Sequence, residues 1–149
     1  MRVLFDTSVL ITAVVTELPR HAPAFTCFKA FTGGEHEGCC TTHTLAECYA
    51  TLTALPLSRR IRPAEAARLI DETIVERLVV FDLDTDAYRR SVRRVAELSL
   101  ASGVIYDALH LAAAEHHRCV RLYTYNEKHF RRLVPDGVSV MAPPPLPEG

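Results

Sequence analysis

The chain has 149 residues, of which 48% are apolar and 23% are charged, and its formal net charge is −1. This length predicts a single domain that can bury a core without a disulfide or a structural metal, and the near-neutral charge excludes a strongly basic nucleic-acid binder while allowing a local basic patch. The apolar runs are much shorter than the roughly 20 residues of a membrane span, and Asp6 ends the first run too early for a signal peptide.

Short apolar runs alternate along the chain with segments that carry helix caps and helical periodicity. In chain order, these patterns predict a strand at residues 3–5, helices at 9–15 and 19–31, a strand at 39–42, helices at 44–55 and 63–74, a strand at 77–83, helices at 84–103 and 105–117, and strands at 120–124 and 138–141. The proline-rich residues 143–149 predict an extended tail behind a domain of residues 1–142.

The alternation of strands and helices predicts an α/β fold. Its sheet is expected to be short and mostly parallel, with about five strands and with helices on both faces. In such sheets, ligands bind beyond the carboxyl ends of the strands, near the point where the strand order reverses. Asp6 follows the first predicted strand and Asn126 follows the fourth. The sequence therefore predicts a site at this edge of the sheet.

Asp107 is the residue that most clearly indicates chemistry. Its predicted helix, residues 105–117, is apolar on nearly every side and is expected to be buried. A buried carboxylate without a partner is unstable, so Asp107 must meet a cation, a hydrogen-bond donor or a metal. Two structural roles compete with a metal site, namely a pair with His110 and a cap at the start of the helix.

Three further polar residues each have an ordinary structural explanation. Asp6, between a strand and a helix, is typical of a helix N-cap. Glu47 lies opposite the apolar stripe of its helix, where a solvated side chain is the default, although its neighbours are small and neutral. Asn126 follows a strand, where asparagine commonly shapes a turn. Phe130, shortly after it, is expected to fold back onto the core.

These signals are specific in combination. Four segments occur in order: residues 3–10 (VLFDTSVL), 44–49 (TLAECY), 106–114 (YDALHLAAA) and 124–126 (TYN), the last followed by Phe130. With these motifs the chain resembles, over nearly its whole length, the PIN-domain ribonucleases, and most closely the toxins of the VapBC toxin–antitoxin type. The resemblance implies a metal-dependent endoribonuclease that leaves a 5′ phosphate. It also implies a cytoplasmic toxin that forms a homodimer and binds a small cognate antitoxin.

The resemblance also implies roles for individual residues. Asp6, Glu47 and Asp107 would be the metal-binding acids. Thr7 would help to position the site. Three converging carboxylates stay ionised together only with a cation between them, and their oxygen atoms suit Mg²⁺, with Mn²⁺ as a possible substitute.

Two positions depart from the acidic version of this pattern. Asn126 stands where many members carry a fourth acid, and it keeps one oxygen ligand without the charge. His129 stands where an acid is common before the phenylalanine. These departures leave the second metal position open, and with it the alternative of a non-catalytic PIN scaffold that binds RNA or protein.

The chain has fifteen arginines and only two lysines. Arg89, Arg90, Arg93 and Arg94 form two i,i+4 pairs on the predicted long helix, and Arg89 and Arg93 are candidates for positioning substrate phosphates. A second arginine cluster lies at residues 59–62. A solvated helix face or a subunit contact explains either cluster equally well.

Two other enzyme or metal classes fit parts of the pattern. A phosphatase of the haloacid-dehalogenase type needs a second Asp two positions after the first, where this chain has Ser8. A zinc protein needs histidines and cysteines at ligand spacing, which the chain lacks. Four of its seven histidines are instead expected to be packing or surface residues: His43, His110, His116 and His117.

The five cysteines include no Cys-x-x-Cys pair. They therefore predict neither a zinc ribbon nor a thiol–disulfide motif. We expect them to be reduced, mostly buried and apolar in character, as in a cytoplasmic protein.

Overall fold

The computed structural model describes residues 1–148 and contains one five-stranded sheet with the order β3-β2-β1-β4-β5. Its strands are β1 (Arg2–Phe5), β2 (Glu37–Thr41), β3 (Val79–Phe81), β4 (Arg121–Tyr123) and β5 (Ser139–Met141). The expected α/β class is confirmed, and the sheet is entirely parallel rather than mostly so. The strand order reverses at β1, because the chain runs from β1 to β2 on one side and later returns to β4 on the other.

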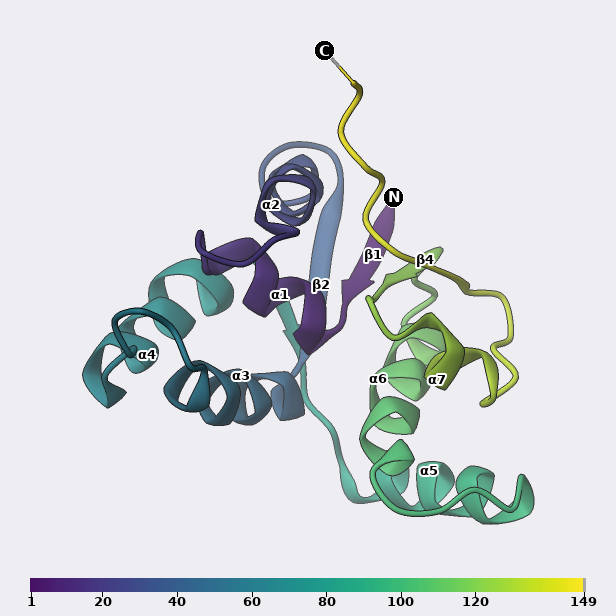
Figure 1. Cartoon of the computed structure of the whole chain (residues 1–149). Helices are drawn as coiled ribbons and strands as arrows, with labels where there is room; N and C mark the ends of the chain where they lie inside the picture. The colour runs from purple at the N-terminus through teal and green to yellow at the C-terminus, as the bar shows by residue number, and fades with distance from the viewer. Residues whose placement is uncertain (149) are drawn as a thin grey trace.

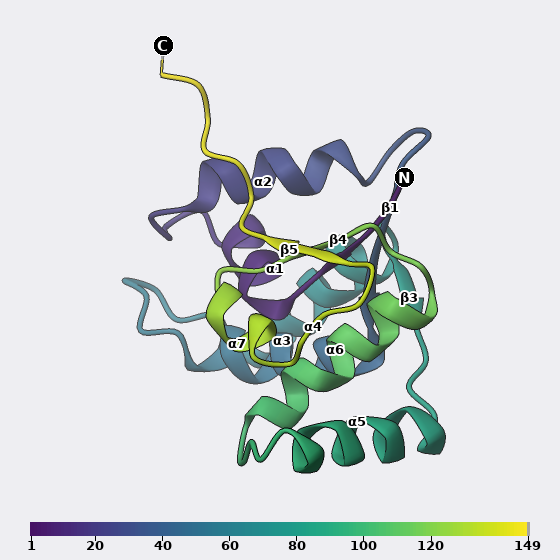
Figure 2. The same cartoon turned by 90° about the vertical axis from the view of Figure 1, so that its right-hand side faces the viewer.

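Helices cover both faces of the sheet, as expected (Figure 1 and Figure 2). One face carries α1 (Thr7–Val14), α2 (His21–Ala30), α3 (Thr42–Ala54) and α4 (Pro63–Leu69), which continues into the π-helical segment η1 (Ile70–Val75). The other face carries α5 (Thr85–Glu97), α6 (Val104–His116) and α7 (Glu127–Arg131). Each layer has its own apolar core, with Phe5 and Leu52 in the first and Leu4, Leu111 and Phe130 in the second. The predicted return of Phe130 to the core is confirmed.

Local hydrogen bonds fix several helix starts where the sequence places them. Asp84 caps α5, because its Oδ1 accepts a hydrogen bond from the Ala87 N–H at 2.8 Å. Thr41 and Thr44 form a capping box at the start of α3. Pro63 occupies the first turn of α4, where its missing N–H costs nothing.

Some boundaries differ from the expected ones. Helix α5 ends at Glu97 and does not continue to Gly103, because the backbone turns through left-handed conformations at Ser99 and Ser102, with φ of 55° and 65°. Helix α2 begins at His21, after a run of turns, and not at Pro19. Helix α7 has no counterpart among the expected elements. It is one short helix in a segment whose sequence predicts a turn.

The remaining expectations about burial concern cysteines and membrane spans. All five cysteines are buried and free, as expected. No helix within residues 1–148 has both the length and the apolar character that crossing a membrane requires.

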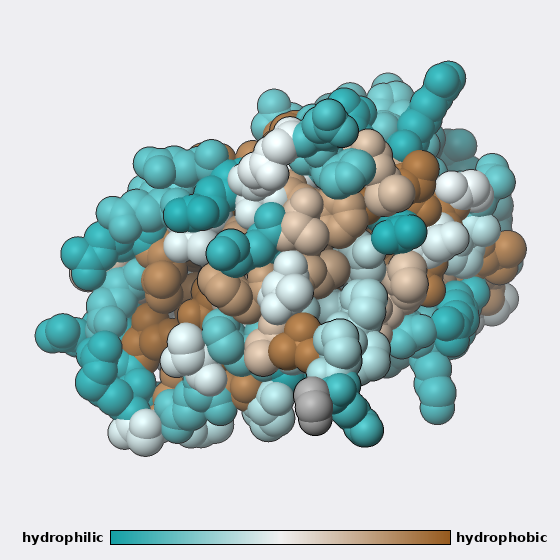
Figure 3. Space-filling model, turned by 90° about the horizontal axis from the view of Figure 1, so that it is seen from above, coloured by the Kyte–Doolittle hydropathy of each residue, from teal (hydrophilic) through white to brown (hydrophobic). Residues whose placement is uncertain are grey.

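On the face seen from above, apolar side chains surround a hollow (Figure 3). A cavity of about 890 Å³ opens between α1, α2 and η1, with Phe25, Phe28 and Leu69 in its wall.

Candidate active site

The carboxyl ends of β1 and β4 bring together segments that are far apart in the chain. Asp6 directly follows β1, and its backbone N–H donates to the carbonyl of Tyr123 at the end of β4, at 3.0 Å. Helix α3 begins where β2 ends, and α6 packs against β1, β2 and β4. Figure 1 shows α3 and α6 on either side of the end of β1. This is the point where the strand order reverses, as the sequence predicts for a ligand site.

Asp6 is held in place by two hydroxyl groups. Its Oδ2 accepts hydrogen bonds from Thr124 Oγ1 at 2.8 Å and from Ser8 Oγ at 2.9 Å. The residue occupies the N-cap position of α1, but its side chain makes no capping hydrogen bond. The N-cap position expected for Asp6 is confirmed, but its carboxylate does not cap the helix and is held by Thr124 and Ser8, although Asp6 is only 4% exposed.

Glu47 extends from α3 toward α6 and is not a solvated surface residue. Its Oε1 lies 2.6 Å from Nε2 of His110 and accepts a hydrogen bond from Thr7 Oγ1 at 3.1 Å. Burial by itself raises the pKa of Glu47, but the hydrogen bond and charge of His110 outweigh it, and the pKa is lowered overall. Glu47 therefore stays ionised in a half-buried place.

Asp107 lies in the first turn of α6. Burial raises its pKa to about 6, and the negative charges of Asp6 and Glu47 add to this rise, whereas His110 and His129 oppose it. The expected pair with His110 is not formed, because that imidazole is bound to Glu47. Asp6 and Glu47 therefore lie near enough to Asp107 for their negative charges to raise its pKa.

Each of the three acids keeps at least one oxygen free of protein partners. In residues 1–148, Asp6 Oδ1, Glu47 Oε2 and both oxygens of Asp107 accept no hydrogen bond from the protein. The one buried side-chain polar atom without a partner in that range is the Tyr125 hydroxyl, so these carboxylate oxygens are open to solvent. The site thus presents several hard oxygen atoms toward the surface.

This donor set fits a hard divalent cation. Oxygen atoms of carboxylates that leave room for water and phosphate are what Mg²⁺ prefers. A cation beside Asp107 would offset both the burial of its charge and the repulsion from Asp6 and Glu47, which together raise its pKa. Within the described part of the chain, no three side chains of His, Cys, Asp or Glu lie close enough together to hold a metal ion between them. In this structure hydroxyl groups hold Asp6, and Thr7 and His110 hold Glu47.

The other predicted site residues differ in whether they contact the acids. Thr7 contacts Glu47 directly. The Asn126 side chain is exposed and makes no hydrogen bond within residues 1–148, but its backbone N–H donates to Thr124 Oγ1 at 2.9 Å. Arg89 and Arg93 are exposed on α5, and no hydrogen bond joins them to the acids.

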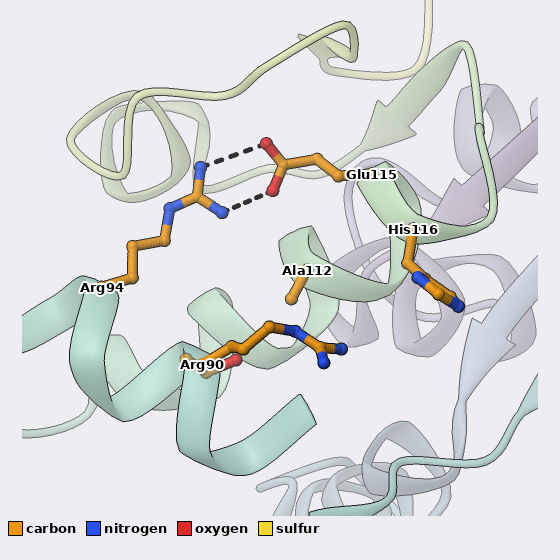
Figure 4. Close-up of a pocket in the computed structure, with 6 residues that line it drawn as sticks. Arg90, Arg94, Ala112, Glu115 and His116 are labelled. Atoms are coloured by element: carbon orange, nitrogen blue, oxygen red, sulfur yellow. Dashed lines mark hydrogen bonds and ion pairs between the residues drawn. The ribbon is translucent and has the colours of Figure 1, made fainter. Parts of the chain in front are cut away.

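The arginine cluster on α5 is partly structural. Arg94 forms a two-pronged ion pair with Glu115 of α6 (Figure 4), and its Nε donates to the carbonyl of Leu133 at 2.9 Å. Arg90 and Arg94 both line a cavity of about 390 Å³, and His116 also lies in its wall. Arg94 thus ties α5 to α6 and the following loop and is not available for phosphate.

Three residues that hold the acids were not assigned to the site from the sequence. Ser8 and Thr124 hold Asp6, and His110 holds Glu47. The interpretation of His110 as a packing residue is right about its burial but wrong about its role, since it contacts a site carboxylate. One signal for it was present, because a histidine three residues after Asp107 lies on the same side of the helix.

A model of the PIN domain family matches residues 3–134 of the chain. The chain is similar to Ribonuclease VapC27 of Mycobacterium tuberculosis, with 36% identity over 112 residues, which cover 74% of this chain and 76% of that protein. Its fold is similar to the crystal structure of Mycobacterium tuberculosis VapC20, a sarcin–ricin loop cleaving toxin, with a TM-score of 0.67 and 15% identity over 85% of this chain and 92% of that one. It is also similar to VapBC2 from Rickettsia felis bound to a promoter DNA fragment, with a TM-score of 0.67 and 15% identity over 94% of this chain and 97% of that one.

Proposed function

This chain belongs to the PIN domain family, and we propose that it is a metal-dependent endoribonuclease and the toxin of a toxin–antitoxin pair. Its relative VapC27 is named a ribonuclease. The observation that carries the proposal is the set of open carboxylate oxygens from Asp6, Glu47 and Asp107 at the point where the strand order reverses. A phosphodiester backbone brings negative charge to this acidic edge, so a cation is needed between substrate and protein.

Asp6, Glu47 and Asp107 would hold Mg²⁺, with Mn²⁺ as a substitute. Mg²⁺ bound there supplies an activated water at neutral pH and stabilises charge on the leaving oxygen. Asn126 would contribute an amide oxygen at the open side of the site. Thr7 orients Glu47, and Ser8 and Thr124 orient Asp6, so that the acids keep their directions as substrate enters.

The chain's own residues also determine where RNA can approach. The acids face solvent at the edge of the sheet formed by the carboxyl ends of the strands. Arg89 and Arg93, which are exposed on α5, remain candidates for holding RNA phosphates. We assign no nucleophilic side chain, because hydrolysis by water requires none.

The partner of this site is a small cognate antitoxin. An arginine or lysine from such a protein can pair with the three acids and compete with the metal. The toxin itself forms a homodimer in the cytoplasm, where its five free, buried cysteines stay reduced.

Incubation of total RNA with the purified protein, with Mg²⁺ or with a chelator, tests the reaction on a gel. We expect cleavage with Mg²⁺ and none with the chelator or with Asp6→Asn. Cleavage that continues in the chelator would refute the metal dependence. RNA binding without cleavage in either condition would favour the non-catalytic scaffold.

A further inference from the structure

A chain of buried hydrogen bonds runs from the start of α3 through α6 to Glu47. Thr44 Oγ1 lies 3.2 Å from Thr41 Oγ1, Thr41 Oγ1 lies 3.0 Å from Nδ1 of His110, and Nε2 of His110 lies 2.6 Å from Glu47 Oε1. Thr41, Thr44 and His110 are all fully buried. From this geometry we infer that His110 is a positioning residue for Glu47, an inference that rests on the proposed metal-dependent function.

The proton that matters in this hydrogen-bond chain lies on Nε2 of His110, which donates it to Oε1 of Glu47. At the other side of the ring, Nδ1 faces Oγ1 of Thr41, and the hydroxyls of Thr41 and Thr44 each serve as donor or acceptor. The contacts therefore form whether or not Nδ1 carries a second proton. Within the described residues, no buried side-chain donor or acceptor of Thr41, Thr44 or His110 lacks a partner, so this set of hydrogen bonds is internally complete.

His110 links two helices that each carry one of the acids. It lies three residues after Asp107 on α6, and it contacts Glu47 on α3. A glutamate side chain has three rotatable bonds and would otherwise sample many positions of its free oxygen. Because His110 and Thr7 both bind Oε1, Oε2 is left pointing away from them. His110 therefore fixes the direction of Glu47 relative to Asp107.

Packing alone does not explain the presence of His110. A fully buried imidazole must satisfy two ring nitrogens, whereas a leucine fills such a space without any polar partner. Groups that orient metal-binding carboxylates from behind typically change metal affinity by about 10- to 100-fold when they are lost. The inferred role thus has a measurable consequence that simple core packing lacks.

Mn²⁺ titration calorimetry on full-length wild-type and variant proteins tests the inference without an activity assay. We expect His110→Leu to weaken Mn²⁺ binding by about 10- to 100-fold. His110→Gln, which keeps a donor near the Nε2 position, should stay close to the wild-type affinity. His116→Leu, at the far exposed end of the same helix, is the matched control and should leave the affinity unchanged.

Double substitution separates an action through Glu47 from a general structural effect. In a Glu47→Ala background, His110→Leu should cause no further loss of Mn²⁺ affinity. An equal loss in both backgrounds would overturn the inference, and so would an unchanged affinity in folded His110→Leu. Asp6→Asn tests the proposed metal site separately from the role of His110. If it leaves Mn²⁺ binding intact, the proposed metal site fails, whereas if it abolishes binding and His110→Leu does not weaken it, only the inference about His110 fails.

A magnetic-resonance measurement keeps the inference falsifiable even if His110→Leu does not fold. We expect nitrogen spectra of wild-type protein to show a slowly exchanging proton on Nε2 of His110, both without metal and with Mg²⁺. Loss of this proton signal on Mg²⁺ addition would show that the contact with Glu47 breaks as the ion binds, and would overturn the inference.

Discussion

Nδ1 of His129 lies 3.7 Å from Oδ2 of Asp107. His129 is exposed and belongs to the short helix α7, whereas Asp107 is half-buried on α6. Where the family pattern commonly has an acid, this chain thus places an imidazole beside the carboxylate. The positive charge of a protonated His129 lowers the pKa of Asp107, but burial and the charge of Asp6 outweigh it.

Asp107→Asn should abolish Mg²⁺-dependent RNA cleavage and stabilise the metal-free protein. The raised pKa of about 6 means that folded Asp107 holds its proton more tightly than unfolded Asp107. Stability of the metal-free wild type therefore falls as pH rises from about 4 to about 6 and stays lower above that. At pH 7 we expect the variant to be more stable by about 1–3 kcal/mol, a figure discounted because the side chain is 19% exposed.

Denaturant unfolding with a chelator at pH 4 and at pH 7 measures this effect. The stability gain should be present at pH 7 and nearly absent at pH 4. At pH 4 the folded wild type carries a protonated Asp107, which is as uncharged as the asparagine of the variant. A gain of equal size at both values would show that the charge of Asp107 is not its cause. Undiminished cleavage by the variant would remove Asp107 from the metal site.

Gly38→Ala should destabilise the fold, because β2 has no room for a side chain at this position. A Cβ there would lie 2.9 Å from the carbonyl oxygen of Phe31 and 2.9 Å from a methyl group of Leu78. The Phe31 carbonyl already accepts a hydrogen bond from the Gly38 N–H and cannot easily withdraw. We expect a loss of about 1–3 kcal/mol in thermal or denaturant unfolding. Gly33→Ala is the control, because a Cβ at Gly33 meets nothing within 4 Å, and its stability should change little.

Light scattering tests the proposed homodimer. At high micromolar concentration we expect the mass of two chains, and a strictly monomeric protein would contradict the homodimer.

A cleavage assay tests the proposed antitoxin contact. Addition of a basic antitoxin segment should reduce cleavage in competition with Mg²⁺. Inhibition that excess Mg²⁺ cannot relieve would place the antitoxin away from the acids.

Local sequence patterns, namely apolar runs and helix-start residues, predicted most of the fold. The apolar runs found all five strands, and Asp84 and Pro63 marked helix starts that the structure confirms. The end of α5 was missed because two serines take left-handed conformations that their sequence does not require. The turn chemistry of residues 124–126 likewise concealed the short helix α7.

The location of the site was predictable, but the partner of each acid was not. Topology places Asp6 at the reversal of strand order from the sequence alone. Whether His110 binds Asp107 on its own helix or Glu47 on another depends on how α3 and α6 pack, which no local pattern encodes. The same reason explains why the sequence predicted the N-cap position of Asp6 but not the partner of its carboxylate, since Thr124 lies 118 residues away in the chain.

Asn126→Asp should strengthen Mn²⁺ binding in the absence of RNA. The amide oxygen of Asn126 is a weaker ligand than a carboxylate and adds no charge, so a centre with three acids should hold one ion firmly and a second only when substrate phosphate supplies oxygens. The backbone of Asn126 is bound to Thr124, which also holds Asp6, so the position is fixed close to the site. Titration calorimetry with Mn²⁺, which tolerates mixed oxygen and nitrogen donors, compares this variant with wild type and with His129→Asp, which puts an acid beside Asp107. Equal affinities for wild type and Asn126→Asp would refute a ligand role for Asn126, and a gain confined to His129→Asp would move the fourth ligand position to residue 129.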